Sequence, residues 1–377
     1  MTPLQDNTTA PEPRVDNRLA EIRQRRGVAA AALARLAGVS RQTIYAMEAG
    51  DYVPNTAVAL RLARALEVPV EDLFRLDPAQ PRPPRSVRAE IIGAGDLFAG
   101  TPIELCRVDG RLVGVPAVPA PRQLPPTDAL LVSPTRSTVQ LLRDEDSEIR
   151  LLVAGCDPGI SVLARHMLRA GVEMVVAQRN SSQALALLKQ GVIHVAGSHL
   201  RDAASGESNL PAIHRLFPRN RVAVVSLAVW EVGLVLAPGN PKSIGSVADC
   251  ARRDIGIVNR EPGAGSRMLL DAHLDRLGLA GEKVRGYDRL AGGHLPAAWQ
   301  VRVGDADCCI ATRAAARVFG LDFIPLASER YDLAIRREHL DYPPVEALLD
   351  TLNRAGFRRE LEGLGGYDTS TAGRRLL

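Results

Sequence analysis

The chain has 377 residues, of which 46% are hydrophobic, so it is long and apolar enough to bury sizeable cores in two or three domains. Its net charge of +4 is too small to indicate nucleic-acid binding by itself. No apolar run reaches the roughly 18 residues that a membrane span needs, and the polar start of the chain is unlike a secretion signal. We therefore expect a cytoplasmic protein without membrane contacts.

The N-terminal part of the chain has the pattern of a helical module. A polar arm over residues 1–16, which we expect to be disordered, precedes five short predicted helices over 17–74. Within residues 30–50, small and apolar side chains recur where two helices that cross at about 90–120° must touch, and Gly38 falls in the turn between them. Ser40 is a good N-cap for the second helix, whose outer face would reach base edges in the major groove. The candidate DNA-binding residues on that face are Ser40, Arg41, Gln42, Thr43 and Tyr45.

Residues 17–75 resemble the Xre-type helix-turn-helix family, which is phage-repressor-like. The matching phrases are "RLAEIRQRRG", "VSRQTIYAMEAGDYVPN" and "ALRLARALEVPVEDLF". The resemblance implies that Arg23 pairs with Glu48 and so holds the first helix on the third. The chain departs from the family at Ala29 and Ala30, where Ser or Thr followed by Gln usually caps a helix and touches a phosphate. A plain helical hairpin is the alternative interpretation.

A single module of this kind buries little DNA surface. Useful affinity would need two copies on two half-sites, so we expect a homodimer that binds a double-stranded DNA operator. Arg41 and Gln42 carry the forked polar groups that recognise guanine and adenine, respectively.

Two segments separate this module from the rest of the chain. Residues 76–87 are too rich in proline to be helical and predict a semi-rigid linker. Residues 88–148 contain short apolar runs broken by glycine and proline, with "VDGR" as a hairpin signal, and predict a small β-rich spacer segment. The run "IIGAGDLFAG" is a weak match to a dinucleotide-binding fingerprint, because Phe98 occupies the third glycine position.

From residue 149 onwards, strand-like apolar runs alternate with helical patterns, which predicts α/β architecture with a largely parallel sheet. The last helical pattern covers 344–363. Three strand-to-helix junctions, at 154–161, 178–185 and 259–270, are rich in glycine, polar side chains and arginine. Ligands of open α/β sheets bind where such helix starts converge, and free N–H groups, hydroxyls and arginines together favour an oxyanion.

Residues 149–377 resemble the cytoplasmic branch of the type II periplasmic-binding-protein fold, a molybdate-binding-like domain. The resemblance rests on phrases such as "VNREPGAGSRMLLD", "GYDRLAGGHLPAAWQVRVGDAD" and "GGYDTSTAG". It implies two lobes joined by crossover strands, near 226–236 and 322–327, that close on a ligand. The family tends to have Ser where this chain has Cys156, and often Asp where it has His194. Because a thiol is a poorer donor than a hydroxyl, we expect a small anion or anionic metabolite rather than molybdate alone.

Together these patterns predict a multidomain chain: an all-α helix-turn-helix domain, a small β-rich segment and a two-lobed α/β domain of the type II periplasmic-binding-protein kind. The candidate ligand-binding residues are Cys156, Asp157, Asn180, Ser181, Ser182, Arg260, Gly265, Ser266, Arg267 and Tyr287. The expected effector is a small anion such as molybdate or tungstate, and we expect no further cofactor.

The spacing of histidines and cysteines gives no sign of a metal site. The seven histidines include no HExxH, the five cysteines no CxxC, and no serine lies in a GxSxG elbow. We therefore expect no metal and no catalytic residues, and predict a one-component transcription regulator rather than an enzyme. Two alternatives stay open. One is an enzyme that acts on an anionic substrate, with Asp157, His199 or Tyr287 as its acid or base, and the other is an oxyanion-binding module with weak DNA binding.

Overall fold

The computed structural model describes residues 15–76, 85–93, 97–117, 124–142, 150–202, 205–218 and 220–377. Contacts divide the chain into two compact units, Met1–Arg85 and Ser86–Leu377. Most of the predicted arm (1–16) and of the predicted linker (76–87) lies outside the described residues. Within the described ranges, no helix is both long enough and apolar enough to cross a membrane.

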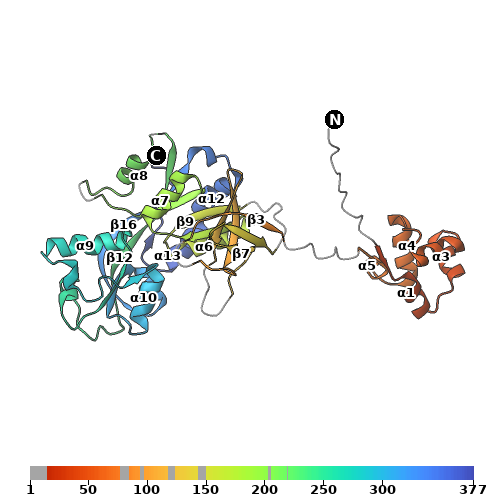
Figure 1. The fold of residues 1–377 in the computed structure, drawn as a ribbon, viewed down its shortest axis with the longest axis horizontal. Coiled ribbons are helices and arrows are strands. Elements are labelled where there is room, and N and C mark those ends of the chain that lie inside the picture. Colours follow the sequence, from red (N-terminus) through yellow and green to blue (C-terminus); the bar gives the residue numbers. More distant parts are fainter. Residues whose placement is uncertain are drawn as a thin grey trace. The chain divides into compact units, whose positions relative to one another are not determined.

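The first unit is a bundle of short helices closed by a two-stranded ribbon (Figure 1). Its described helices are α1 (Leu19–Arg25), α2 (Ala30–Ala37), α3 (Arg41–Ala49), α4 (Thr56–Leu66) and α5 (Val70–Leu73). Strands β1 (Val15–Asn17) and β2 (Phe74–Leu76) pair antiparallel, so main-chain hydrogen bonds order the end of the expected arm. Leu33 on α2, Ile44 and Met47 on α3 and Leu62 on α4 are fully buried, which confirms the pattern of crossing helices.

The second unit begins with a β-sheet. Among the described residues it consists of β3 (Ser86–Arg88), β4 (Glu90–Ile91), β5 (Pro102–Val108), β6 (Arg111–Pro116), β7 (Ala129–Ser133) and β8 (Thr138–Leu141). The strand order is β3-β8-β7-β5-β6-β4. Asp109 and Gly110 join β5 to β6 with φ values of 48° and 77°. This left-handed pair is what a two-residue hairpin turn needs, so the hairpin predicted from "VDGR" is confirmed.

A larger sheet follows, with the strand order β10-β9-β11-β16-β12-β15-β13-β14 and with β17 beside β12. Its strands are β9 (Arg150–Gly155), β10 (Glu173–Gln178), β11 (Val195–Ser198), β12 (Val222–Leu236), β13 (Ile257–Arg260), β14 (Leu290–Ala291), β15 (Cys308–Thr312), β16 (Asp322–Arg336) and β17 (Tyr367–Asp368). The expectation of a largely parallel sheet is wrong at its centre. Strands β9 to β11 are parallel, as are β13 to β15, but β12 and β16 run antiparallel to each other and to β15 and β11. The reason is that these two 15-residue strands cross the whole sheet in opposite directions.

The long strands β12 and β16 join two lobes (Figure 1). The first lobe carries α6 (Ile160–Arg169), α7 (Ser181–Gln190), α8 (Leu210–Leu216), α12 (Pro343–Asn353) and α13 (Ala355–Gly363) around β9, β10 and β11. The second carries α9 (Gly265–Arg276), α10 (His294–Arg302) and α11 (Arg313–Val318) around β13, β14 and β15. Short 3-10 turns are η1 (Val247–Ala251), η2 (Gly281–Lys283) and η3 (Arg337–His339). The helix expected over 344–363 is broken at Arg354, whose ψ of 126° is extended rather than helical.

The β-rich sheet packs on the first lobe and shares a core with it. Val108 of β5 lies in one apolar cluster with Leu152 of β9. The Arg150 guanidinium is buried at the same junction, where it donates to the Leu105 carbonyl at 2.7 Å and to Glu173 Oε2 at 2.9 Å. The segment is thus fixed to the first lobe by apolar contact and by a buried, hydrogen-bonded cation.

Half-buried Glu104 on β5 gives this junction a pH dependence. Burial, aided by Asp128 and Glu173 and opposed by Arg150, raises the pKa of Glu104 to about 7. Between a pH of about 4.5 and about 7 the folded protein holds this proton more tightly than the unfolded chain, so the free energy of unfolding falls as the pH rises. We expect Glu104→Gln to remove this part of the slope in denaturant titrations at several pH values. The exposed control Glu346→Gln should retain it, and equal slopes in all three proteins would contradict the assignment.

Candidate functional site

One face of α3 carries the side chains that the sequence assigned to DNA. Ser40 caps the helix, since its Oγ accepts a hydrogen bond from the Thr43 N–H at 3.0 Å. Arg41, Gln42 and Tyr45 are exposed beside it, and the Arg41 guanidinium donates to the Tyr45 hydroxyl at 2.8 Å. The structure therefore brings the five candidate residues together on one polar surface at the start of the helix.

An ion pair fixes α3 against α1. Arg23 Nη2 donates to Glu48 Oε2 at 3.0 Å, Arg23 Nε donates to the same carboxylate, and Arg23 Nη1 donates to the Val28 carbonyl at 3.0 Å. The side chains of Arg23 and Glu48 are 13% and 10% exposed, so the pair is largely withdrawn from water. Helix α2, in contrast, has Ala29 at its N-cap and no side-chain cap, which follows from its departure from the family pattern.

The second and third of the predicted strand-to-helix junctions meet where the two lobes face each other. Asn180, which precedes α7 on the first lobe, donates through its side-chain amide to Glu261 Oε1 at 3.1 Å on the second lobe. Ser182 on α7 donates through its hydroxyl to the Gly263 carbonyl at 3.2 Å. These hydrogen bonds cross from one lobe to the other, so the structure shows the lobes in contact.

Gly265 at the start of α9 touches the first lobe directly. A Cβ at this position would lie 2.5 Å from Cε1 of His199 and 3.1 Å from its carbonyl oxygen, which is closer than real Cβ contacts. The available space, rather than the backbone conformation, therefore requires glycine here.

Several buried polar atoms at this interface have no hydrogen-bond partner among the described residues. Arg260, which ends β13, is 2% exposed and pairs with Glu261 through Nε and Nη2 at 3.0 Å, but its Nη1 is unpaired. The Ser266 hydroxyl on α9 and the Trp230 indole nitrogen on β12 are also buried and unpaired. Helix α9 has no side-chain cap, so its first N–H groups add to these donors. Such a set of donors suits an anion.

The polar groups of the first lobe are already engaged within the protein. Asn180 caps α7 in a capping box with Gln183. Ser181 Oγ accepts a hydrogen bond from the His199 N–H at 3.0 Å, and Ser182 donates to the second lobe. In this structure these three candidate ligand-binding residues therefore shape and close the cleft between the lobes.

Cys156 and Asp157 follow β9 and are buried beside the same interface. Cys156 Sγ lies 3.3 Å from His199 Nε2. Asp157 Oδ1 accepts hydrogen bonds from the Tyr367 hydroxyl at 2.6 Å and from the Gly159 N–H at 2.7 Å, while Oδ2 has no partner in the described part of the chain. Burial outweighs these two hydrogen bonds and raises the pKa of Asp157 to about 6.

Arg267 and Tyr287 lie together on the second lobe. The Arg267 guanidinium carbon is 4.5 Å from the centre of the Tyr287 ring, and the Tyr287 hydroxyl donates to Asp271 Oδ1 at 2.7 Å. Arg267 also donates to the Arg260 carbonyl at 3.1 Å. Both candidate residues thus contact their own lobe, and these contacts do not bring them to the junctions of the first lobe.

Sequence reasoning missed four residues of the interface, namely Trp230, His294, Glu329 and Tyr331. It considered His199 only as a donor or as a possible acid or base, yet this residue is central. His199 Nδ1 lies 2.7 Å from Glu329 Oε2, and the His199 ring packs against Trp230 and Tyr331. Trp230 and Glu329 are paired across the long strands β12 and β16. A strand register of this kind leaves no signal in the local sequence.

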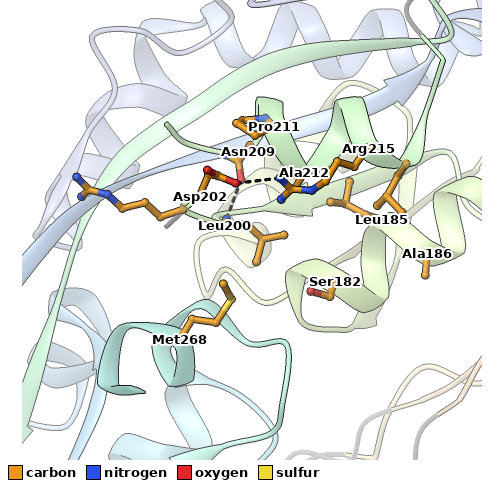
Figure 2. Close-up of a pocket in the computed structure, with 12 residues that line it drawn as sticks. Ser182, Leu185, Ala186, Leu200, Asp202, Asn209, Pro211, Ala212, Arg215 and Met268 are labelled. Atoms are coloured by element: carbon orange, nitrogen blue, oxygen red, sulfur yellow. Dashed lines mark hydrogen bonds and ion pairs between the residues drawn. The ribbon is translucent and has the colours of Figure 1, made fainter. Parts of the chain in front are cut away.

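A groove of about 490 Å³ opens between α7, α8 and α9 (Figure 2). Its lining is mainly apolar and includes Leu185 and Leu200 from the first lobe and Met268 from α9. Of the candidate ligand-binding residues, the lining includes Ser182. The buried donors at Arg260 therefore belong to a different place at the interface.

The fold and the site define a protein in which a helix-turn-helix domain is joined to a two-lobed α/β domain with a donor-rich interface. The chain belongs to the PBP superfamily, whose domain matches residues 164–353, and a helix-turn-helix domain matches residues 17–76. Both resemblances inferred from the sequence are thereby confirmed.

Two relatives come from Bacillus subtilis. Uncharacterized protein YvgK is 32% identical over 235 residues, which are 62% of this chain and 76% of YvgK. Uncharacterized HTH-type transcriptional regulator YgzD is 41% identical over 61 residues, which are 16% of this chain and 92% of YgzD. Among solved structures, the sulfate-binding protein SubI from Mycobacterium tuberculosis aligns with a TM-score of 0.44 and 16% identity, over 59% of this chain and 86% of SubI.

Removal of one partner of the Arg23–Glu48 pair would leave a poorly hydrated charge without its counter-ion. We expect Arg23→Ala to destabilise the first unit by about 3 kcal/mol, measured as lost protection of α1 and α3 amides in hydrogen exchange. The control Arg25→Ala removes an exposed partner of Glu21 and should cost less than about 1 kcal/mol. Equal losses in the two variants would show that the pair does not hold these helices together.

Proposed function

We propose that the protein is a one-component transcription regulator, in which the helix-turn-helix domain binds operator DNA and the two-lobed domain senses a small anion. The observation that carries the proposal is the set of buried, unpaired donors of Arg260, Ser266 and Trp230, in a chain that also presents an exposed recognition-helix face. We further propose that the protein acts in the cytoplasm as a homodimer and that it is not an enzyme.

On the DNA side, the proposal rests on the polar face at the start of α3. Hydrogen bonding to Tyr45 orients the Arg41 guanidinium, whose fork matches guanine, while Gln42 is free to match adenine. Because Ala29 leaves α2 without a side-chain cap and without one phosphate contact, affinity depends more strongly on two copies bound to two half-sites. The HTH-type regulator YgzD supports the assignment over this part of the chain.

On the ligand side, a buried guanidinium with a spare N–H is costly until an acceptor completes it. An oxyanion has acceptors on several sides, so one ion would satisfy Arg260 Nη1, the Ser266 hydroxyl and the first N–H groups of α9 together. Molybdate and tungstate are the first candidates. Other small anions and anionic metabolites follow, because Cys156 offers a thiol where a hydroxyl would be a better donor.

The two lobes would couple ligand to DNA by closing. The hydrogen bonds from Asn180 to Glu261 and from Ser182 to Gly263 join the lobes only when they are in contact. An anion shifts the equilibrium towards this closed form by as much as it binds the closed form better than the open one. In a dimer, closure would change the spacing of the two recognition helices and hence the affinity for the operator.

Ser266→Ala tests the anion site with little risk to folding, because Ser266 Oγ has no hydrogen-bond partner among the described residues. We expect the variant to fold normally and to bind the anion about tenfold more weakly, since it lacks one hydrogen bond. Thermal-shift titrations with molybdate, tungstate, sulfate, phosphate and small carboxylates identify the anion. A ligand at about 100 times its Kd adds about 2.7 kcal/mol to the free energy of unfolding. Ser161→Ala, at an exposed serine in the first turn of α6, is the matched control.

The same three proteins are then titrated with DNA from the protein's own promoter region and followed by fluorescence anisotropy. We expect salt-sensitive, sequence-specific binding in all of them. At an anion concentration near the wild-type Kd, the anion should change this binding in the wild type and in Ser161→Ala but much less in Ser266→Ala. The proposal fails if none of the anions shifts the unfolding temperature, or if no specific DNA binding occurs under any condition.

A further inference from the structure

Three metal-ligating side chains from separate elements converge beside the lobe interface. Cys156 follows β9, His199 follows β11, and His294 begins α10. The Cys156 Sγ and one ring nitrogen from each histidine all lie within 4.8 Å of one another, and Cys156 Sγ is 3.3 Å from His199 Nε2. Ligand atoms on a tetrahedral zinc ion are about 3.3 to 3.6 Å apart, given Zn–S and Zn–N bonds of about 2.3 and about 2.0 Å. The three side chains are thus close to the arrangement that an ion requires.

His294 is the second, independent observation. Its side chain is 1% exposed, and both ring nitrogens lack a hydrogen-bond partner in the described residues. A buried imidazole normally satisfies at least one nitrogen, because an unpaired buried polar atom opposes folding. A metal ion shared with Cys156 and His199 would give one of these nitrogens its partner.

Glu329 orients His199 in the way that metal sites require. Its Oε2 lies 2.7 Å from His199 Nδ1, which leaves Nε2 directed at Cys156. The His199 ring is further held by stacking on Tyr331, at a centroid distance of 5.9 Å, and by an edge contact with Trp230 at 4.9 Å. A carboxylate behind the ligating histidine is the common outer-shell arrangement, since it selects the tautomer and fixes the ring.

We propose that Cys156, His199 and His294 bind one transition-metal ion of the zinc type. A thiolate with two imidazoles suits such an ion and does not suit magnesium or calcium, which prefer oxygen ligands. Metal binding releases the Cys156 proton and any proton on His199 Nε2 to solvent. Three protein ligands leave a fourth position open, and if the proposed function holds, an anion in the cleft is the natural group to fill it.

A second cluster in the same unit shows what distinguishes this site. Asp109, Glu338 and His339 also lie within metal-binding distance of one another. There, however, the Arg336 guanidinium pairs with Asp109 and with Glu338, so a protein cation already occupies the place of an ion. Cys156, His199 and His294 have no such cation among them, and both nitrogens of His294 are unpaired among the described residues.

The test uses the full-length protein after treatment with a chelator, titrated with Co²⁺ and then with Zn²⁺. We expect one Co²⁺ per chain, a thiolate-to-cobalt charge-transfer absorption band, and loss of this band when Zn²⁺ displaces Co²⁺. Cys156→Ser should abolish the band, whereas the control Cys250→Ser, which alters another buried thiol, should retain it. Glu329→Gln should weaken metal binding about 10- to 100-fold.

Three results would overturn the proposal. These are the absence of bound metal, a band that persists in Cys156→Ser, and alkylation of Cys156 by iodoacetamide at a rate that Zn²⁺ does not change. The last result would mean that the Cys156 thiol acts as a free nucleophile. Circular dichroism of each variant separates loss of metal from loss of fold. Because anion binding is measured in the presence of chelator, failure of the metal site and failure of the anion site are read separately.

Discussion

Contact between the two lobes is the constraint on which the site depends. Gly265 on α9 reaches His199 at the end of β11, and a residue with a Cβ does not fit there. With the lobes in contact, Arg260 and Ser266 are withdrawn from water, so their unpaired donors gain most from a ligand that completes them. In an open cleft the same groups would be hydrated, and an anion would have to compete with that water.

The rest of the second unit determines which part moves. The β-rich sheet shares a core with the first lobe and is tied to it through Arg150, so sheet and lobe form one body. The second lobe continues from the first through β12 and β16, whose pairing is irregular between Ser226 and Ala228 and again between Val232 and Gly233. Such irregularities bend strands, so the second lobe can swing at these points without breaking either core.

Local chemistry made the local structure predictable. Ser40 as a helix cap and Asp109 as the start of a hairpin turn are decided by residues within a few positions of each other. The site depends on contacts that no local pattern carries, since Glu329 reaches His199 across 130 residues. Asn180 was expected to bind the ligand and instead holds the lobes together, because its partner lies on the other lobe. The antiparallel centre of the sheet was mispredicted for the same reason: alternation of strands and helices does not give the direction of a crossover strand.

Hydrogen exchange in Gly265→Ala tests most directly whether the lobes close through this contact. The added Cβ would lie 2.5 Å from His199 Cε1 and hold the lobes apart. The account predicts faster exchange at residues 180–184 and 261–266 than in the wild type. Gly363→Ala, where a Cβ meets nothing within 4 Å, should exchange like the wild type in both segments. Unchanged exchange in Gly265→Ala, with the variant fully folded, would contradict the closed cleft.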